Sequence, residues 1–357
     1  MDVSFRSGEL LAQSRTFPVL LQMMGLMDKG AYQPLKVAVF LDGRPGHEKQ
    51  TQGIVKALHR LHPLEVTEIR ISRKPFGREL WSWVGYFLGL KSLVTSTQGP
   101  FDLLIGTGSH THIPMLTYKR DSLALCVTCM APLPLLRGRF DLCCVPEHDG
   151  IPAGSNVLLT VGPPNCSASS SEHDRNRGLI LLGGVDEKSH HWNSSEIIAK
   201  VQDLAVREGG KTWTVSSSPR TPQETIFLMD EVAKKLENVE FFRYENTASG
   251  WVEEQYACNG TVWVTADSIS MVYEALSSGC NVGILPVVWK KRNSKFIRSE
   301  RYLLEHGLAV SFAAWRDGVA LWKSNAPLDE AGRCAEAIIT MMHKREKGAA
   351  EGSYPAG

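Results

Sequence analysis

The chain of 357 residues is predicted to fold as α/β, in two domains that each contain a doubly wound parallel sheet. Three observations predict this fold. Apolar, strand-like segments alternate with amphipathic, helix-like segments along most of the chain. A serine-rich break, CSASSSEHDRNRG, interrupts the alternation near the middle, after which it restarts. Polar or glycine-rich clusters follow several strands, at the edge where open α/β sheets bind ligands.

The first domain is expected to span residues 35–166, after an N-terminal extension at residues 1–34. Its first strand is the apolar segment LKVAVFL, and the next helix places Ile54, Leu58 and Leu61 on one face. The later strands are expected in the segments LEVTEIRI, FDLLIGTG, LALCVTC, FDLCCVP and NVLLTVG. Strands of this kind, separated by helices, predict a Rossmann-like domain.

The second domain is expected at residues 178–345, after a linker at residues 167–177. Its strands are expected in LILLGG, TWTVSSS, VEFFRY, TVWVTADS and NVGILPV. Its helices are expected near residues 193–207, 223–237 and 328–345, and after the TVWVTADS strand. The composition of residues 346–357 predicts a disordered tail.

Composition excludes several classes of protein. A formal net charge of +1 argues against a dedicated nucleic-acid binder, which usually has a basic excess. No run of eighteen apolar residues occurs, so we expect no membrane-spanning helix. The eight cysteines lie mostly in apolar segments, which favours reduced core thiols over disulfides. The His110-Thr-His112 spacing has no evident third ligand, so neither a metal nor another cofactor is expected.

The turn Thr265–Ser270 lies where a buried strand meets the amino end of a helix. Free backbone N–H groups and the helix dipole favour anions such as phosphate at that position. Glu274 follows one turn later on the same edge of the helix and could reach back toward a ligand. The alternative is that Ser268 or Ser270 only caps the helix.

The loop Ser216–Pro222 is the second predicted phosphate contact. Thr221 is expected to be the N-cap of the next helix and Pro222 its first residue, which leaves Ser216, Ser218 and Arg220 in the loop. The guanidinium group of arginine can bind two phosphate oxygens at once. The alternative is a solvated arginine beside a capped helix.

The first domain offers candidates for a general acid or base. His47 and Glu48 lie in the turn after its first strand, and Glu147 and His148 follow a later strand. Histidine titrates near neutral pH, and a neighbouring carboxylate can orient it. The glycine-rich turn Gly106–His110 is another polar cluster at a strand end. The alternative for each histidine is a purely structural hydrogen bond.

The segment Trp81–Leu90 is aromatic and apolar, and basic residues flank it. It is too short to span a bilayer, but tryptophan and tyrosine favour the membrane interface and arginine or lysine favours anionic lipid. It therefore predicts a peripheral membrane contact. The alternative is a core helix of the first domain.

These segments together resemble the bacterial branch of the ELM1-like mitochondrial-fission family, whose members are described as glycosyltransferases on the basis of fold. The resemblance rests on DGRPGHEKQ (42–50), VPEHDG (145–150), LLGG (181–184), SSSPRTP (216–222) and VTADSISMVYEA (264–275). It implies a GT-B-like architecture, in which two Rossmann-like domains face a cleft. It also implies a nucleotide-sugar donor bound mainly by the second domain.

This resemblance implies a metal-independent glycosyltransferase that transfers a sugar from a nucleotide-diphosphate sugar to an acceptor of the cell envelope. The expected donor is a UDP-sugar, and the expected acceptor is a glycan or a lipid-linked molecule. The expected catalytic residues are His47, Glu48, Glu147 and His148. The expected donor-binding residues are Gly183, Gly184, Ser216, Arg220, Thr265, Asp267, Ser268, Ser270, Met271 and Glu274. The further residues expected in the cleft of the first domain are Asp42, Gly43, Arg44, Gly46 and Gln50.

Two other functions stay open. Plant members of the family are implicated in recruiting a dynamin-related protein to the mitochondrial surface, so the chain could be a non-catalytic, membrane-peripheral scaffold. A nucleotide-sugar epimerase would share the donor site and need no acceptor. For each of these functions we expect a cytoplasmic protein. If the segment Trp81–Leu90 contacts lipid, we expect the protein to lie on the inner face of the membrane.

Overall fold

The computed structural model describes residues 33–72, 76–89, 100–291, 294–321 and 327–351. The chain divides into two compact units. Unit 1 comprises Met1–Val145, Ile151–Thr160 and Glu330–Gly357, and unit 2 comprises Pro146–Gly150 and Val161–Asp329. The chain therefore changes unit at Pro146, Ile151, Val161 and Glu330. Each unit is described by itself below.

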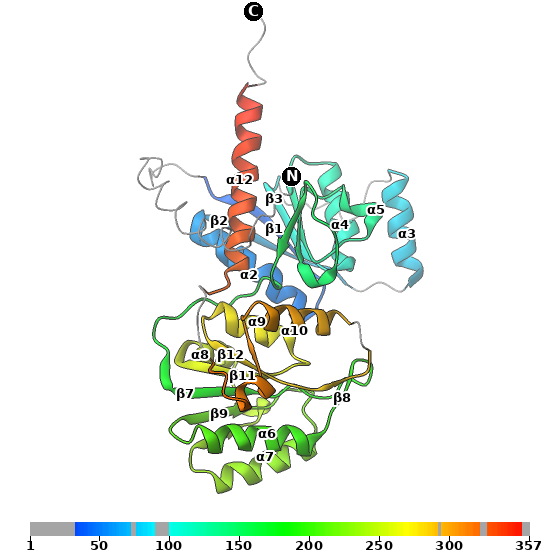
Figure 1. Cartoon of the computed structure of the whole chain (residues 1–357). Helices are drawn as coiled ribbons and strands as arrows, with labels where there is room; N and C mark the ends of the chain where they lie inside the picture. Colours follow the sequence, from blue (N-terminus) through cyan, green and yellow to red (C-terminus); the bar gives the residue numbers. More distant parts are fainter. Residues whose placement is uncertain (1–32, 73–75, 90–99, 292–293, 322–326, 352–357) are drawn as a thin grey trace, which may run out of the picture. The chain divides into compact units, whose positions relative to one another are not determined.

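Unit 1 contains a parallel sheet with the strand order β2-β1-β3-β4-β5-β6 in the described residues (Figure 1). The strands are β1 (Leu35–Leu41), β2 (Leu64–Arg70), β3 (Leu103–Thr107), β4 (Leu125–Cys129), β5 (Leu142–Pro146) and β6 (Val157–Thr160). Every residue of β3, β4 and β5 is buried. Continuous burial explains why these strands have unbroken apolar sequences, since helices cover both faces of the sheet.

The helices of unit 1 are α2 (Pro45–Leu61), α3 (Phe76–Phe87), α4 (Ser109–Arg120), α5 (Pro134–Arg137) and α12 (Glu330–Glu351). On one face of the sheet, α2 and α12 pack together over side chains such as Val37 and Ile105. On the other face, α4 and the inner side of α3 cover Phe40 and Leu104. This arrangement is a doubly wound α/β domain, as the sequence predicts.

Unit 2 contains a second parallel sheet with the order β10-β9-β7-β11-β12-β14 (Figure 1). Its strands are β7 (Asp174–Leu181), β9 (Thr212–Ser216), β10 (Val239–Phe242), β11 (Asn259–Thr265), β12 (Asn281–Leu285) and β14 (Val310–Ser311). A small antiparallel pair, β8 (His190–His191) with β13 (Val288–Trp289), lies apart from this sheet.

Helices cover both faces of the second sheet as well. They are α6 (Ser194–Arg207), α7 (Gln223–Lys235), α8 (Trp251–Cys258), α9 (Ile269–Ser277), α10 (Lys295–Glu305) and α11 (Phe312–Arg316). The helices α6, α7 and α11 enclose Trp213 and Trp263 on one face. The helices α8, α9 and α10 enclose Val262 and Val264 on the other. The predicted fold class is therefore confirmed for both halves of the chain.

The structure differs from the sequence-based division at its boundaries. Contacts place α12 in unit 1 rather than in the second domain, because Cys334, Ala335 and Ile338 are fully buried in the same cluster as Val37. The strand β7 begins at Asp174, inside the predicted linker. The helix α12 continues to Glu351, into the predicted tail. Residues 1–32 and 352–357 lie outside the described residues.

In the part of the chain that the structure describes, no helix combines the length and the apolar character that a membrane crossing requires.

Candidate functional site

Three turns of unit 2 follow neighbouring strands of its sheet. Gly183 and Gly184 follow β7, Ser217–Thr221 follow β9, and Ala266–Ser268 follow β11. Since β9, β7 and β11 are adjacent and parallel, their carboxyl ends lie at one edge of the sheet. The predicted donor-binding turns are therefore neighbours in space, at the edge where α/β sheets bind ligands.

Hydrogen bonds join the three turns into one network. The backbone N–H of Gly183 donates to Oγ1 of Thr265 over 2.7 Å, and that of Gly184 donates to Oδ2 of Asp267 over 3.1 Å. The carbonyl of Gly183 accepts a 2.8 Å hydrogen bond from Oγ of Ser218. Each turn thus fixes the position of another.

Both glycines are required by close packing. A Cβ atom on Gly183 would lie 2.1 Å from Oδ2 of Asp267, and one on Gly184 would lie 1.9 Å from the backbone oxygen of Arg220. A side chain at either position would push the turns apart.

Arg220 carries the positive charge of this network. One of its guanidinium nitrogens, Nη2, donates to Oδ2 of Asp267 over 2.8 Å and to Oγ of Ser268 over 3.1 Å. The Asp267 side chain is 1% exposed, whereas that of Arg220 is 43% exposed. A buried carboxylate therefore holds one terminal nitrogen of the guanidinium group, and the other, Nη1, donates to the carbonyl of Gly184 over 3.5 Å. The side chain is still half-exposed, so an anion can reach it.

The amino end of α9 lies beside Arg220 in this network. Ser268 occupies the N-cap position, but its hydroxyl makes no capping hydrogen bond and instead contacts Arg220 and Asp267. Among the described residues, no acceptor is found for the backbone N–H groups of Ile269 and Ser270. The structure thus disagrees with the capping alternative for Ser268 and leaves two helix N–H groups next to a cation.

Other predicted donor residues lie outside this network. Oγ of Ser216 is buried and donates to the carbonyl of Ser217. Glu274 is buried farther along α9, beside Tyr256, whose hydroxyl donates to the carbonyl of Met271 over 3.2 Å. Burial raises the pKa of Tyr256 well above its ordinary value, and the nearby Glu274 carboxylate adds to the effect.

The N-cap predicted at Thr221 also differs from the structure. The helix α7 begins at Gln223 with Pro222 at its N-cap, and no side chain caps it. The hydroxyl of Thr221 instead contacts the carbonyl of Gly183, where the three turns meet. Thr221 therefore belongs to the network, which the cap pattern in the sequence did not suggest.

In unit 1, the turn between β1 and α2 brings several predicted cleft residues together. Oδ2 of Asp42 lies 2.9 Å from Nδ1 of His47, and Oδ1 accepts from the backbone N–H of Arg44 over 3.1 Å. Oε1 of Glu48 accepts from the backbone N–H of Gly43 over 3.1 Å. Two carboxylates thus stabilise one short turn, with the histidine bound to the buried one.

The remaining cleft residues flank this turn. Gly46 is exposed in the first turn of α2, and a Cβ atom there would meet nothing within 4 Å. Oε1 of Gln50 is buried and has no hydrogen-bond partner among the described residues. The structure assigns neither residue a contact with His47.

Two residues lie close to His47 that the sequence did not suggest as its neighbours. Gly108 follows β3 with a φ of 92°, and a Cβ atom there would lie 2.4 Å from Nδ1 of His47. His112 is buried in α4, and burial, with a smaller contribution from the charge of His47, lowers its pKa to about 4. The glycine-rich turn after β3 was the available signal, but its contact with His47 depends on the sheet order.

Glu147 and His148 belong to unit 2 and so to a different unit from His47 and Glu48. The carbonyl of His148 accepts hydrogen bonds of 3.1 and 2.8 Å from Arg298, and its ring stacks on that of Tyr273. Burial lowers the pKa of His148, while Asp149 opposes the shift. Glu147 is exposed in the short helical turn Glu147–Asp149. These contacts fix His148 but do not pair it with Glu147.

The sequence model of the family described as mitochondrial fission ELM1 matches residues 45–342. The chain belongs to this family. No curated protein sequence matches it significantly.

Solved structures show what this ELM1-family chain is similar to. A UDP-GlcNAc 2-epimerase from Methanocaldococcus jannaschii matches with a TM-score of 0.51 and 11% identity, over 86% of this chain and 100% of that one. A glycosyltransferase from Rickettsia africae matches with a TM-score of 0.45 and 10% identity, over 88% of this chain and 100% of that one. At such identities the likeness shows the fold, a GT-B-type pair of Rossmann-like domains.

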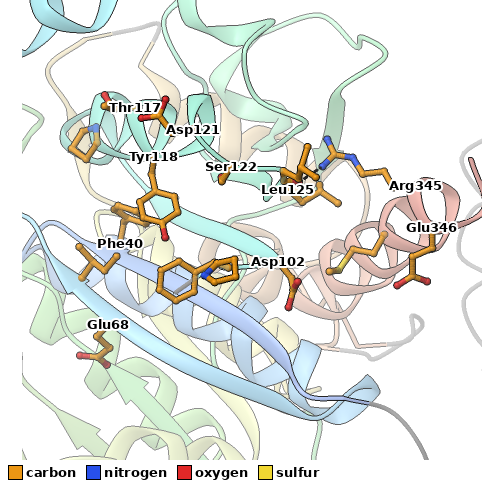
Figure 2. Close-up of a pocket in the computed structure, with 16 residues that line it drawn as sticks. Phe40, Glu68, Asp102, Thr117, Tyr118, Asp121, Ser122, Leu125, Arg345 and Glu346 are labelled. Carbon is orange, nitrogen blue, oxygen red and sulfur yellow. Dashed lines mark hydrogen bonds between the residues drawn. The ribbon is translucent and has the colours of Figure 1, made fainter. Parts of the chain in front are cut away.

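A hollow of about 950 Å³ opens on unit 1 but contains none of the predicted site residues. Figure 2 shows it between α4 and α12, lined by side chains that include Phe40, Asp102, Tyr118, Leu125 and Arg345. Asp102 and Leu125 lie at the amino ends of β3 and β4, whereas Asp42 and Gly108 follow carboxyl ends. Ligands of α/β sheets bind at the carboxyl ends, so we do not assign the donor or acceptor to this hollow.

The ELM1-family chain shows no metal-ligand cluster of three His, Cys, Asp or Glu side chains in its described residues. Nε2 of His112 contacts Oγ1 of Thr128 over 3.2 Å. All eight cysteines are free, and burial raises the pKa of Cys129 and Cys143 to about 12. Thiols held protonated in this way are core side chains rather than nucleophiles.

Proposed function

We propose that the chain binds a nucleotide-diphosphate sugar at the carboxyl edge of the unit 2 sheet and transfers its sugar to an acceptor. The observation that carries this proposal is the position of Arg220 beside the amino end of α9. There a half-exposed guanidinium group adjoins two backbone N–H groups for which the described part of the chain offers no acceptor. Such a combination suits the two charged phosphates of the donor.

The same groups would stabilise the leaving diphosphate. When the bond between the sugar and the diphosphate breaks, negative charge accumulates on the phosphate oxygens. Arg220 and the N–H groups of Ile269 and Ser270 are fixed before that charge develops, so they need not reorganise during the reaction. Glu274 is proposed to accept a hydrogen bond from a hydroxyl group of the donor.

The acceptor hydroxyl has to lose a proton in this reaction. His47 and Glu48 of unit 1 are the proposed general bases, and Glu147 and His148 are the alternatives from unit 2. A UDP-sugar is the proposed donor, because the M. jannaschii relative is named for its action on UDP-GlcNAc and shares the fold.

Calorimetry on the full chain tests donor binding. UDP-GlcNAc, other UDP-sugars, GDP-sugars and CMP-sugars are titrated in turn, together with UDP alone. We expect a UDP-sugar to bind with a dissociation constant in the micromolar to millimolar range typical of enzyme substrates. A folded chain that binds none of these compounds would contradict the proposal.

We further propose that the acceptor is a lipid-linked molecule of the cell envelope. The exposed apolar side chains of α3 support this part of the proposal. On α3, Trp81 is 74% exposed and Val84, three residues later, is partly exposed; Leu88, which directly follows the helix, is 69% exposed. Trp83 and Tyr86 face the core instead, and Arg139 lies over the Tyr86 ring. An apolar helix face next to a cation fits an anionic lipid surface, whereas a core helix would bury Trp81. Leu90 lies outside the described residues.

Vesicle flotation tests the membrane contact. We expect the chain to float with vesicles of phosphatidylglycerol more than with phosphatidylcholine, and Trp81→Ala with Leu88→Ala to reduce flotation. Val319→Ala, an exposed apolar change in unit 2, is the matched control. Equal flotation of the double variant and the control would contradict a membrane role for α3.

A nucleotide-sugar epimerase is the second candidate, because the relative with a TM-score of 0.51 is named as one. The two reactions are distinguished by their products. An epimerase converts UDP-GlcNAc into its C2 epimer without an acceptor, whereas a glycosyltransferase releases UDP in proportion to acceptor. Proton NMR of the sugar during incubation separates these outcomes.

A further inference from the structure

His190 lies beside the Gly183–Gly184 turn of unit 2 and belongs to none of the motifs that the sequence analysis singled out. Its ring nitrogen Nε2 lies 2.9 Å from the carbonyl oxygen of Gly184. We propose that His190 is a positioning residue whose hydrogen bond to this carbonyl fixes the Gly183–Gly184 turn and leaves Nη1 of Arg220 available to the diphosphate. The diphosphate rests on the proposed function, whereas the hydrogen bond that holds the turn does not.

The His190 ring is enclosed by two tryptophans. The residue is 2% exposed, and the centroid of its ring lies 6.2 Å from that of Trp192 and 5.8 Å from that of Trp289. The indole nitrogen of Trp192 donates to Oγ1 of Thr225 over 2.9 Å. The indole nitrogen of Trp289 donates to Oε2 of Glu300 over 3.0 Å. Because both tryptophans are held in place, the imidazole between them has little freedom to turn.

The hydrogen-bond partners of His190 decide its tautomer. A backbone carbonyl can only accept a hydrogen bond, so Nε2 carries a hydrogen and donates it to Gly184. In the neutral ring the lone pair then lies on Nδ1, which accepts from the hydroxyl of Ser189 over 2.7 Å. Both ring nitrogens are therefore engaged, and together they fix the orientation of the ring.

The peptide bond between Gly184 and Val185 links His190 to Arg220. Its carbonyl, on Gly184, accepts the 2.9 Å hydrogen bond from His190. Its N–H group, on Val185, donates to the backbone carbonyl of Arg220 over 2.9 Å. Because a peptide bond is planar, hydrogen bonds at its two opposite ends fix its orientation. His190 thereby fixes the position of the turn relative to the backbone of Arg220.

The same carbonyl of Gly184 also contacts the side chain of Arg220. Nη1 of Arg220 lies 3.5 Å from the carbonyl oxygen, whereas Nε2 of His190 lies 2.9 Å from it. The shorter hydrogen bond is the stronger one, so the carbonyl binds mainly to His190 and holds Nη1 only weakly. Without the imidazole, the carbonyl would need another donor and would draw the guanidinium group toward itself, away from a bound phosphate.

Calorimetry of the full chain with UDP separates the hydrogen bond from packing. His190→Phe keeps a ring between the two tryptophans but removes the donor, whereas His190→Gln keeps an N–H donor. We expect His190→Phe to weaken UDP binding on the order of 10-fold and His190→Gln to stay within about threefold of the wild type. His191→Gln, at the exposed neighbour in β8, is the matched control and should bind UDP normally. Wild-type affinity in His190→Phe, or equal losses in both His190 variants, would overturn the inference.

Nitrogen NMR of the full chain with ¹⁵N-labelled histidine tests the contact without a ligand. The two ring signals that are missing from the spectrum of His190→Gln are those of His190. We expect hydrogen on Nε2 and none on Nδ1 in the neutral ring. Hydrogen on Nδ1 alone would overturn the inference, because Nε2 could then not donate to Gly184.

Hydrogen exchange of the unliganded chain measures how firmly the turn is held. We expect the amides of Gly184 and Val185 to exchange roughly 10-fold faster in His190→Phe and at the wild-type rate in His191→Gln. Unchanged exchange at both amides in His190→Phe would overturn the positioning role. If the wild type binds no nucleotide, the proposed function fails, and the exchange and the tautomer still decide whether His190 fixes the turn.

Discussion

Arg220 lies where three turns of unit 2 meet, and its guanidinium group is held by Asp267 and Ser268. Its position could be anticipated from the sequence, because SSSPRTP follows a strand and precedes a helix. Asp267 was also predicted for the donor site, but its ion pair with Arg220 could not be anticipated, because the contact depends on β9, β7 and β11 being neighbours in a particular order. Ser216 shows the same limit, since the last residue of β9 points its hydroxyl inward.

Arg220→Ala should weaken binding of UDP roughly 10- to 100-fold, because a charged hydrogen bond to phosphate is lost. Calorimetry with UDP measures the effect. Arg243→Ala is the matched control, since Arg243 is similarly exposed and also pairs with an aspartate of unit 2, Asp230. Equal affinities of the two variants for UDP would show that Arg220 does not contact the phosphates.

His112 should make the stability of unit 1 depend on pH. Its pKa is about 4 in the folded protein and 6.5 in the unfolded chain, so the unfolded state binds more protons between these values. The free energy of unfolding should therefore be highest above pH 6.5 and fall by up to about 3 kcal/mol as the pH decreases toward 4.

Urea unfolding at pH 7.0, 5.5 and 4.5 measures this contribution. His112→Phe should flatten the pH dependence, whereas removal of the exposed His59 by His59→Gln should leave it unchanged. An identical slope for wild type and His112→Phe would show that His112 is not a buried neutral histidine.

The helices α6 and α7 lie within two residues of the bounds that their sequence periodicity predicts. The helix α12 was predicted as an element but was assigned to the second domain. Periodicity identifies an apolar face on a helix without identifying what covers that face. The contacts show that unit 1 covers this face, since Ile338 and Cys334 are fully buried in the unit 1 cluster. The length of α12 was underestimated because its last residues, KREKGAAE, have no apolar face to mark them.

Ile338→Ala should destabilise unit 1 by about 2–5 kcal/mol, as expected when a buried isoleucine is truncated. Hydrogen exchange should accelerate in β1 and α2, which share its cluster, and stay unchanged in β11 of unit 2. Lys344→Ala, an exposed change on the same helix, should alter neither. Faster exchange confined to β11 would place the helix with unit 2 instead.

At the scale of the whole molecule, each unit supplies a different part of the proposed reaction. Unit 2 contains the cation and the helix N–H groups that are proposed to bind the diphosphate, and unit 1 contains the proposed base His47. The alternation of strands and helices predicted both sheets. The path of the chain, which returns to unit 1 at Glu330, could not be predicted, because it depends on contacts between distant segments.

Hydrogen exchange of the full chain with and without UDP tests the central claim most directly, because it locates the bound nucleotide without assuming a reaction. Amides that bind phosphate or lie beside it should exchange more slowly. We predict slower exchange at Gly183–Gly184, Ser217–Thr221 and Thr265–Met271, and a much smaller change in Arg220→Ala at a UDP concentration near the dissociation constant of the wild type. Protection elsewhere, with these three turns unaffected, would contradict the account.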